Sequence, residues 1–466
     1  MKLYNSLTRS KDEFVPNEEG KVNIYTCGPT VYHFAHIGNL RTYIMEDALV
    51  RSLEYLGYDV NRVMNITDVG HLTGDSDDGE DKMLKGAKRE KKSVMEIAKF
   101  YTDAFFKDCR ELNIKEPTHI QPATGCIPEF IEMVQKLIEN GFAYEAGGNV
   151  YFDISKLDKY YVFGEHDASD LEVGVREGVE GDINKKNPAD FALWFTKSKF
   201  DDQELKWDSP WGVGYPGWHI ECSAISLKYN GEYLDIHCGG IDNAFPHHTN
   251  EIAQSEAYIG HKWCNFWFHV LHLNTASGKM SKSKGEFLIL DLLKSKGYDP
   301  LAYRFFCLLS HYRKPLVFSY EALDNAAGTY KKLRAKTSSL KDDGEVDMEA
   351  FSQAREKFAS AVGNDVNTSL AVTAVYDALK LNVNDATKKA IIKDYDRVLA
   401  LDLTEPMKAE ENGGDEADPE ILNMIALRAQ AKKDKNYAEA DRIRNELLSM
   451  GITLIDTANG TTYKKN

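Results

Sequence analysis

The feature that most constrains this chain is a strand, a helix and a second strand that follow one another within about 45 residues. Residues 22–27 form an apolar run typical of a short buried strand, and residues 59–66 alternate between apolar and polar side chains. Between them, apolar residues recur at helical spacing from Leu40 to Leu56. This order predicts a βαβ unit, and therefore an α/β fold built on a Rossmann-like, doubly wound parallel sheet. Ligands of such sheets bind at the carboxyl ends of the strands.

The composition is that of a globular protein with room for about three domains. Of its 466 residues, 42% are hydrophobic and 28% are charged, so large buried cores are possible. No apolar run is long enough to span a membrane and no signal peptide begins the chain, so we expect a cytoplasmic protein without membrane partners. Seven scattered cysteines do not predict a disulfide framework. The net charge of −16 excludes a general polyanion binder, although a local basic surface remains possible.

Changes in composition, charge and hydrophobic periodicity divide the chain into six predicted segments. Short strands and glycines between residues 149 and 207 indicate an insertion, and the chain after Pro315 is predicted to be entirely helical. Residues 402–420 hold eight carboxylates and one lysine, whereas residues 421–466 hold eight basic and five acidic residues. The expected segments are the first half of the α/β domain (1–120), a connective insertion (121–215), the second half of the α/β domain (216–305), an all-helical bundle (306–401), an acidic linker (402–420) and a small basic module (421–466).

The first candidate phosphate-binding motif lies between the first predicted strand and helix. It reads Ala35-His36-Ile37-Gly38-Asn39. Unpaired N–H groups and the positive end of the helix dipole favour anions at such a position. Gly38 would allow a nucleotide to approach the backbone closely, and His36 could donate to phosphate oxygens. Taken alone, the motif also fits an ordinary helix cap or packing residue.

A second candidate lies about 240 residues later, in the loop Lys279-Met280-Ser281-Lys282-Ser283. Two lysines and two hydroxyls in a small-residue loop suit a clamp on a polyphosphate, because they supply positive charge and neutral donors. The loop could equally be a solvated basic segment.

Together, the two motifs resemble those of the class I aminoacyl-tRNA synthetases, whose ATP site combines a His-Ile-Gly-His-like segment with a Lys-Met-Ser-Lys-Ser loop. The loop matches at all five positions, while Asn39 replaces the second histidine of the other motif. The resemblance implies His36, Lys279 and Lys282 as catalytic residues. It also places the adenosine at the Gly239-Gly240-Ile241-Asp242 turn. The implied ATP-binding residues are His33, His36, Gly38, Asn39, Gly240, Asp242, Lys279, Ser281 and Lys282.

Four residues could together hold a metal ion: Cys27, Cys222, His247 and Glu251. His247 and Glu251 are four residues apart, so on a helix they share one face. Thiolate, imidazole and carboxylate groups are all zinc ligands. However, the spacing is not that of a zinc finger. The residues alone are therefore also consistent with a buried strand-end cysteine and an ordinary helical pair.

The segments around these residues resemble the zinc-carrying segments of cysteinyl-tRNA synthetases. They are Thr26-Cys27-Gly28, Gly217-Trp218-His219-Ile220-Glu221-Cys222 and Phe245-Pro246-His247-His248, and the resemblance covers essentially the whole chain. It implies one Zn²⁺ per chain, held by Cys27, Cys222, His247 and Glu251, and Mg²⁺ bound with ATP. Cys27, Thr67 and Trp218 would then surround the substrate cysteine. The roles of Cys238, which stands in the place of a family glycine, and of Asp68 and His71 stay open.

Zinc would solve a problem of substrate selection. Cysteine and serine differ by one atom, and an apolar pocket separates such near-isosteres by only about 100-fold. A metal with an open position binds a thiolate directly and favours its deprotonation, whereas a hydroxyl is a harder and less acidic ligand.

The basic C-terminal module is the candidate tRNA contact, because the carboxyl-terminal half of this family recognises the tRNA. The implied residues are Arg428, Lys432, Lys433 and Tyr437, which could pair with phosphates and stack on unpaired bases. Their charge alone would equally suit a solvated amphipathic helix.

The resemblance implies a cysteine–tRNA ligase that acts as a monomer on ATP, L-cysteine and tRNA(Cys). One alternative is a ligase that activates cysteine with ATP and joins it to a small amine, as thiol-sugar ligases do. The length of the C-terminal module argues against it. Another is a non-catalytic RNA-binding protein that kept the fold, which the intact lysine-rich loop and all four candidate zinc ligands argue against.

Overall fold

The computed structural model describes most of the chain, in two compact units, Met1–Thr404 and Glu405–Asn466. The described residues are 1–69, 93–164, 183–197, 204–275, 278–279, 288–406, 419–434, 436–457 and 460–465.

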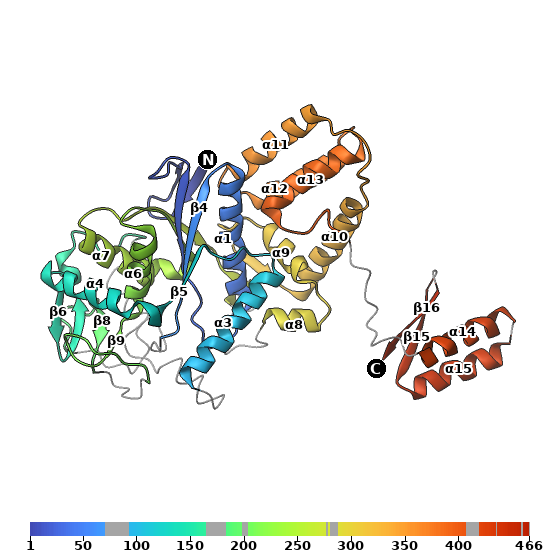
Figure 1. Cartoon of the computed structure of the whole chain (residues 1–466), viewed down its shortest axis with the longest axis horizontal. Helices are drawn as coiled ribbons and strands as arrows, with labels where there is room; N and C mark the ends of the chain where they lie inside the picture. Colours follow the sequence, from blue (N-terminus) through green and yellow to red (C-terminus); the bar gives the residue numbers. More distant parts are fainter. Residues whose placement is uncertain are drawn as a thin grey trace. The chain divides into compact units, whose positions relative to one another are not determined.

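A parallel five-stranded sheet forms the centre of the larger unit, in the order β11-β10-β3-β4-β5 (Figure 1). Its strands are β3 (Lys21–Thr26), β4 (Asp59–Ile66), β5 (His119–Pro122), β10 (Leu234–Gly240) and β11 (Cys264–Val270). The neighbours β3 and β10 are more than two hundred residues apart in sequence, with Ile24 beside Ile236. The strand order therefore reverses between β3 and β10, which is where ligands bind in doubly wound sheets. The predicted Rossmann-like fold is confirmed.

Helices cover both faces of this sheet. The largest helices around it are α1 (Ile37–Tyr55), α3 (Val94–Glu111), α4 (Ile127–Glu139), α6 (Trp218–Asn230) and α7 (Thr249–Ile259). One hydrophobic core joins α1 and α3 to the sheet, and a second joins α4, α6 and α7 to its other face. The βαβ unit predicted from the sequence is β3-α1-β4. The helix begins three residues before Leu40 because His36 caps it.

The insertion forms a small antiparallel sheet of its own, in the order β6-β7-β8-β9. The strands are β6 (Ala143–Ala146), β7 (Asn149–Phe152), β8 (Phe191–Phe195) and β9 (Tyr215–Pro216). Aromatic side chains hold it together: Phe152 and Phe191 stack with their ring centroids 5.0 Å apart.

Helices dominate the rest of the larger unit. They are α8 (Leu290–Ser295), α9 (Pro300–Leu308), α10 (Tyr320–Ser338), α11 (Met348–Val362), α12 (Thr368–Lys380) and α13 (Asp385–Leu399). The remaining short elements are β1 (Lys2–Asn5), β2 (Ser10–Glu13), β12 (Leu273–Thr275), β13 (Gly278–Lys279), β14 (Leu316–Phe318), η1 (Ala123–Cys126), η2 (Ile154–Lys156), η3 (Ile241–Asn243) and η4 (Ala244–His248). The helical bundle packs into the same core as α1.

The smaller unit pairs two helices with a β-hairpin. Its elements are α14 (Pro419–Lys433), α15 (Tyr437–Ser449), β15 (Ile452–Thr457) and β16 (Gly460–Lys465). Its core contains Ile421, Ile443, Leu447 and Ile452. The expectation that everything after Pro315 is helical is therefore wrong at β14 and at this hairpin. The residues of β15, Ile-Thr-Leu-Ile-Asp-Thr, are mostly β-branched and favour a strand.

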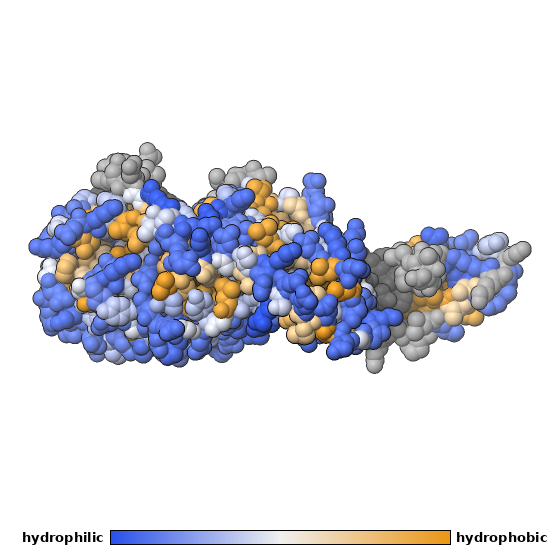
Figure 2. Space-filling view, turned by 90° about the horizontal axis from the view of Figure 1, so that it is seen from above, coloured by the Kyte–Doolittle hydropathy of each residue, from blue (hydrophilic) through white to orange (hydrophobic). Residues whose placement is uncertain are grey.

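The face of the larger unit seen in Figure 2 is mostly hydrophilic, with hydrophobic side chains in separate patches. None of the described helices is both long enough and apolar enough to cross a membrane. All seven cysteines are buried and none forms a disulfide, as expected.

Candidate active site

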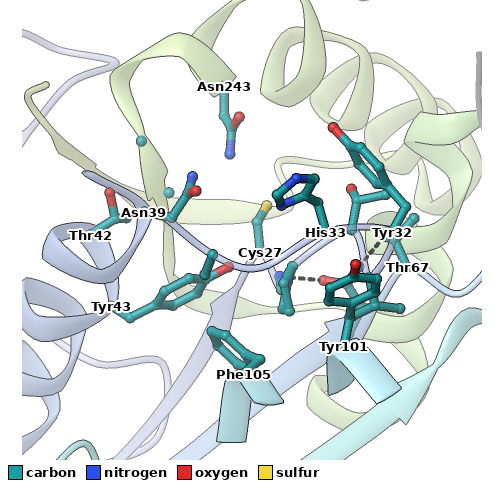
Figure 3. A pocket seen from close by; sticks show the side chains of 18 of the residues that line it. Cys27, Tyr32, His33, Asn39, Thr42, Tyr43, Thr67, Tyr101, Phe105 and Asn243 are labelled. Carbon is teal, nitrogen blue, oxygen red and sulfur yellow. Dashed lines mark hydrogen bonds between the residues drawn. The ribbon is translucent and has the colours of Figure 1, made fainter. Parts of the chain in front are cut away.

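A cavity of about 360 Å³ opens where β3 and β10 end and α1 begins. It therefore lies at the switch point of the sheet, as the doubly wound topology predicts. In Figure 3, Cys27 lies at its centre, Asn39 and Asn243 lie on one side, and Thr67 and Tyr101 on the other. The candidate residues in its wall are Cys27, His33, His36, Asn39, Thr67, Trp218, Cys222, Gly240, Asp242 and His247. Residues predicted separately for ATP, cysteine and metal thus line one cavity.

His36 caps helix α1 at the cavity wall. Its Nδ1 accepts from the N–H of Asn39 at 3.0 Å, and its own N–H donates to Oδ1 of Asn39 at 3.3 Å, so the two residues form a reciprocal cap. Because Oδ1 of Asn39 is engaged, Nδ2 is the group that can donate into the cavity. The asparagine in place of the family's histidine thus keeps a donor there.

Gly38 serves the cap itself. A Cβ at this position would lie 3.0 Å from two ring atoms of His36, so a larger residue would require the capping imidazole to shift by a few tenths of an ångström. The sequence suggested that Gly38 allows close approach of a nucleotide. That role stays a prediction; Gly38 is not among the described residues of the cavity wall, and its nearest neighbour is the His36 ring.

Another part of the wall comes from the end of β10. Gly239, Gly240, Asp242 and Asn243 line the cavity there. A Cβ on Gly240 would lie 2.7 Å from Oδ1 of Asp242, so the glycine lets the turn fold back on the carboxylate. The backbone and carboxylate expected to hold the adenosine therefore face the same space as His36.

Only the beginning of the lysine-rich loop is described. The backbone of Lys279 pairs with Asn274 in the β12–β13 ladder. Ser281 and Lys282 lie outside the described residues, as does His71. Beyond the loop, the N–H of Ile37 donates to the carbonyl of Leu288 at 2.8 Å, which ties the chain after the loop to the start of α1.

The four predicted metal ligands converge, with Cys27, Cys222 and His247 lining the cavity and Glu251 fully buried beside them. One ligand atom from each of Cys27, Cys222, His247 and Glu251 lies within 4.8 Å of all the others. Nε2 of His247 is 3.5 Å from Sγ of Cys222 and 3.1 Å from Oε1 of Glu251. Ligands of one zinc ion, bound at about 2.0–2.3 Å, lie roughly 3.3–3.8 Å apart. The predicted helical pair is therefore brought together, with η4 supplying His247 and α7 supplying Glu251.

The chemistry of the cluster fits a cation. Burial raises the pKa of Glu251 to about 8, and burial also raises the pKa of Cys222. A hydrogen bond with Cys222, reinforced by burial, raises the pKa of Cys27 well above its usual value. Oε1 of Glu251 is buried and makes no hydrogen bond within the described part of the chain, although His247 is near. A metal ion would satisfy this oxygen and hold both thiols as thiolates.

A second set of possible ligands overlaps the first. Cys27, His237, His248 and Glu251 also lie within 4.8 Å of one another. Nε2 of His237 is 2.8 Å from Oε2 of Glu251, and Nε2 of His248 is 3.3 Å from Sγ of Cys27. Burial lowers the pKa of both imidazoles, which keeps them neutral.

Sequence reasoning did not assign these surrounding histidines. His219 also belongs to the group, because its Nδ1 lies 2.8 Å from Nδ1 of His247. The available signal was a histidine within β10, a strand of an otherwise buried parallel sheet that should read as apolar throughout.

The residues whose roles the sequence left open are also placed. Cys238 is fully buried in the core that contains α1, as a small core residue and outside both possible ligand sets. Asp68 accepts from the N–H and the hydroxyl of Thr124, at 2.9 and 2.6 Å, and so holds the turn η1. Trp218 lies against His247, with ring centroids 5.2 Å apart.

The predicted tRNA contacts differ in exposure. Tyr437 is 63% exposed and Lys432 is exposed, whereas Arg428 is only 5% exposed. Arg428 is therefore buried, and its role as a tRNA contact stays a prediction. Nothing is described of the Lys433 side chain.

Comparison with known families decides what this arrangement belongs to. The family described as tRNA synthetases class I (C) catalytic domain matches residues 13–328. A cysteine–tRNA ligase of Treponema denticola is 48% identical, and one of Borrelia hermsii is 41% identical. Each alignment covers 100% of this chain and 99% of the relative. The chain belongs to the cysteine–tRNA ligases. It is therefore an aminoacyl-tRNA synthetase of class I, and membership implies ATP, an amino acid and tRNA as substrates.

Solved structures agree at the level of the fold. A methionyl-tRNA synthetase of Mycobacterium tuberculosis in complex with methionyl-adenylate matches with a TM-score of 0.55 and 13% identity, covering 82% of this chain and 90% of that one. A leucyl enzyme of Agrobacterium radiobacter K84, solved with tRNA, also matches with a TM-score of 0.55, at 12% identity. Each covers 84% of the other in that second match.

Proposed function

We propose that the cavity activates L-cysteine with ATP, forming cysteinyl-adenylate and pyrophosphate, and then passes cysteine to the 3′ end of tRNA(Cys). The observation that carries this proposal is that Cys27, Cys222 and His247, which cluster with the buried Glu251, line the same cavity as His36. A thiol held at the cluster would have its carboxylate within the same space as the phosphate-binding end.

We assign Zn²⁺ to this cluster, with Cys27, Cys222, His247 and Glu251 as its ligands. Two sulfurs and one imidazole favour zinc over the harder cations that prefer all-oxygen sites. Zinc would supply a binding position that takes a thiolate far better than a hydroxyl, and this is the basis for rejecting serine. Thr67 and Trp218 would close around the rest of the amino acid.

The reaction needs no covalent protein nucleophile. The cysteine carboxylate attacks the α-phosphate of ATP, which enters with Mg²⁺, and pyrophosphate leaves. His36 and Asn39, at the amino terminus of α1, would donate to the phosphates, with His33 nearby. Gly240 and Asp242 would hold the ribose and adenine. Lys279, Ser281 and Lys282 would neutralise the charge that develops in the transition state, so catalysis rests on positioning and electrostatics.

The tRNA would be recognised outside this cavity. We assign residues 306–401 to tRNA contacts near the catalytic domain and residues 421–466 to the anticodon, with Lys432 and Tyr437 as the exposed candidates. We further propose that the enzyme works as a monomer in the cytoplasm. The unpaired thiols and the nature of its tRNA substrate support that location.

The decisive test is transfer of radiolabelled cysteine to tRNA. We expect acid-precipitable, base-labile label that requires ATP, Mg²⁺ and tRNA, and that unlabelled serine does not compete away. Exchange of pyrophosphate into ATP that depends on cysteine, with no charging of a tRNA pool that contains tRNA(Cys), would instead favour a ligase acting on a small amine. If the zinc-loaded, folded protein shows neither tRNA charging nor pyrophosphate exchange, the proposal is contradicted.

A further inference from the structure

Glu221 lies behind the cavity wall and contacts one of its residues. The side chain lies on α6 and is fully buried. Its Oε2 accepts a hydrogen bond from the hydroxyl of Thr67 at 2.8 Å. Thr67 is only 2% exposed and lines the cavity in the part seen in Figure 3, together with Cys27. The buried carboxylate of Glu221 thus contacts the hydroxyl of a residue that lines the cavity.

Asn65 supplies a second contact to the same hydroxyl. Its Nδ2 donates to Oγ1 of Thr67 at 3.0 Å. The orientation of the amide is set independently, because Oδ1 of Asn65 accepts from the N–H of Gly28 at 2.7 Å. The amide nitrogen of Asn65 therefore faces Thr67, so Asn65 is the donor and the Thr67 hydroxyl the acceptor in this contact.

These two contacts set what Thr67 can offer a ligand. A hydroxyl has one hydrogen to donate and two lone pairs to accept with. The hydrogen of Thr67 goes to Glu221, since a carboxylate can only accept, and one lone pair takes the hydrogen from Asn65. One lone pair of the Thr67 oxygen remains, so Thr67 can only accept a hydrogen bond from a ligand in the cavity. It suits a ligand that brings an N–H donor, preferably a cationic one, because the Glu221 charge lies behind it.

The substrate cysteine carries one such group. If its sulfur is held at Cys27, Cys222 and His247 and its carboxylate faces the α-phosphate, the α-ammonium is the remaining polar group. Thr67 lines the same cavity as those three ligands. We propose that Glu221 is a positioning residue that makes the cysteine subsite select a protonated α-amino group, by holding the Thr67 hydroxyl as an acceptor. This proposal rests on the proposed function.

The test compares two thiols that differ in the amino group. L-Cysteine and 3-mercaptopropionate share the thiol and the carboxylate, and only the first has an α-ammonium. The full-length, zinc-loaded enzyme and its Glu221→Gln variant would be titrated with both, using the KM for cysteine and the inhibition constant for 3-mercaptopropionate in pyrophosphate exchange. We expect the variant to bind cysteine roughly 10- to 100-fold more weakly, because the amide removes the negative charge behind Thr67 and has an NH2 that can donate to the hydroxyl. The inhibition constant of 3-mercaptopropionate should stay within about twofold, and the zinc content should be unchanged.

Two further sets of variants separate this role from general damage. Glu256→Gln removes another carboxylate, one on α7 that accepts from the N–H of Trp263 at 3.1 Å and is not among the described residues of the cavity wall. It should leave both constants unchanged. Thr67→Val removes the hydroxyl at constant shape and should lose the same selectivity, while Thr67→Ser should keep most of it. Thr67→Val also keeps the proposal testable if Glu221→Gln does not fold.

The outcomes distinguish failure of the Glu221 proposal from failure of the proposed function on which it rests. Equal weakening of both thiols in Glu221→Gln, or undiminished preference for cysteine in both Glu221→Gln and Thr67→Val, would overturn the role of Glu221. In either case the parental enzyme would still catalyse cysteine-dependent exchange. Absence of that exchange in the parental enzyme would instead contradict the proposed function itself.

Discussion

Gly38 shapes the end of the cavity where we propose that ATP binds, because it leaves space for the His36 ring. We expect Gly38→Ala to push the imidazole out of its cap, since the new Cβ would lie 3.0 Å from two ring atoms. The rate of pyrophosphate exchange should fall about tenfold or more, in line with a small misplacement at a reacting centre. Gly328→Ala, where a Cβ meets nothing within 4 Å, is the matched control and should leave the rate unchanged. A normal rate in Gly38→Ala would contradict this role.

The two overlapping sets of possible ligands make different predictions for zinc. With the ion at Cys27, Cys222, His247 and Glu251, we expect Cys222→Ala and His247→Gln to lose zinc on dialysis. His237→Gln should keep one zinc per chain with an affinity about 10- to 100-fold lower, because His237 only supports Glu251. Metal analysis after dialysis measures this. Loss of zinc in His237→Gln together with retention in Cys222→Ala would move the ion to the second set.

Single residues also show which parts of the site can be predicted from sequence. Cys27, Cys222, His247 and Glu251 were predictable through the family resemblance, because the residues alone also fit a buried strand-end cysteine and an ordinary helical pair. Glu221 was not, because its partner Thr67 lies about 150 residues away in sequence and only the folded sheet joins them. The burial of Arg428 could not be predicted either, because charge alone does not say which face of a helix packs against the core.

At the scale of elements, a buried arginine joins α9 to α1. Arg304 donates to Asp47 at 2.6 Å and to the carbonyls of Leu399 and Leu112 at 2.7 and 3.0 Å. We expect Arg304→Met to lower the free energy of unfolding by about 3–5 kcal/mol, because Asp47 and two carbonyls lose a buried partner. Denaturant unfolding measures it. Arg397→Met removes an arginine that is 56% exposed and should cost less than about 1 kcal/mol.

The contact between α3 and α8 carries a pH dependence. Burial raises the pKa of Asp108 from 3.8 to about 7, with Asp291 and Glu111 adding to it and Lys107 and Lys294 opposing it. The folded state therefore keeps a proton that the unfolded chain releases between about pH 4 and 7, so this residue lowers stability as the pH rises. We expect Asp108→Asn to stabilise the protein by about 2 kcal/mol at pH 8 and to make no difference at pH 4.

Denaturant unfolding at the two pH values would test this. Asp103→Asn, on the same helix but with a carboxylate that is 66% exposed, should show no comparable pH-dependent gain. An equal effect of Asp108→Asn at both values would contradict the assigned cause.

The elements themselves were predicted where periodicity is strong and misjudged where it is short. The unit β3-α1-β4 is readable because its helix runs for 19 residues beside two apolar strands. The strand β14 has only three residues, and its pairing with β12 depends on a neighbour more than 40 residues away. A short window of sequence cannot contain that information.

At the scale of the whole molecule, the two compact units have separate cores. The chain truncated after Thr404 keeps all of the large cores and the whole cavity. We expect it to fold, to bind zinc and to catalyse pyrophosphate exchange within about twofold of the full chain, while the KM for tRNA rises at least about tenfold as basic contacts are lost. Exchange and aminoacylation assays on the same preparation measure both. An unchanged KM for tRNA would show that the small unit does not contribute to tRNA recognition.

The pairing of β3 with β10 has a consequence for how the protein is made. At about 5–20 residues per second, a ribosome needs roughly 10–45 s to proceed from Cys27 to Glu251. For most of that time Cys27 lacks the other three members of the cluster, because α6, η4 and α7, which carry them, have not yet been synthesised. The nascent chain therefore cannot capture metal until more than half of it has left the ribosome. Zinc loading at the proposed site would therefore be a late event of biosynthesis, and it would report that β10 has been synthesised.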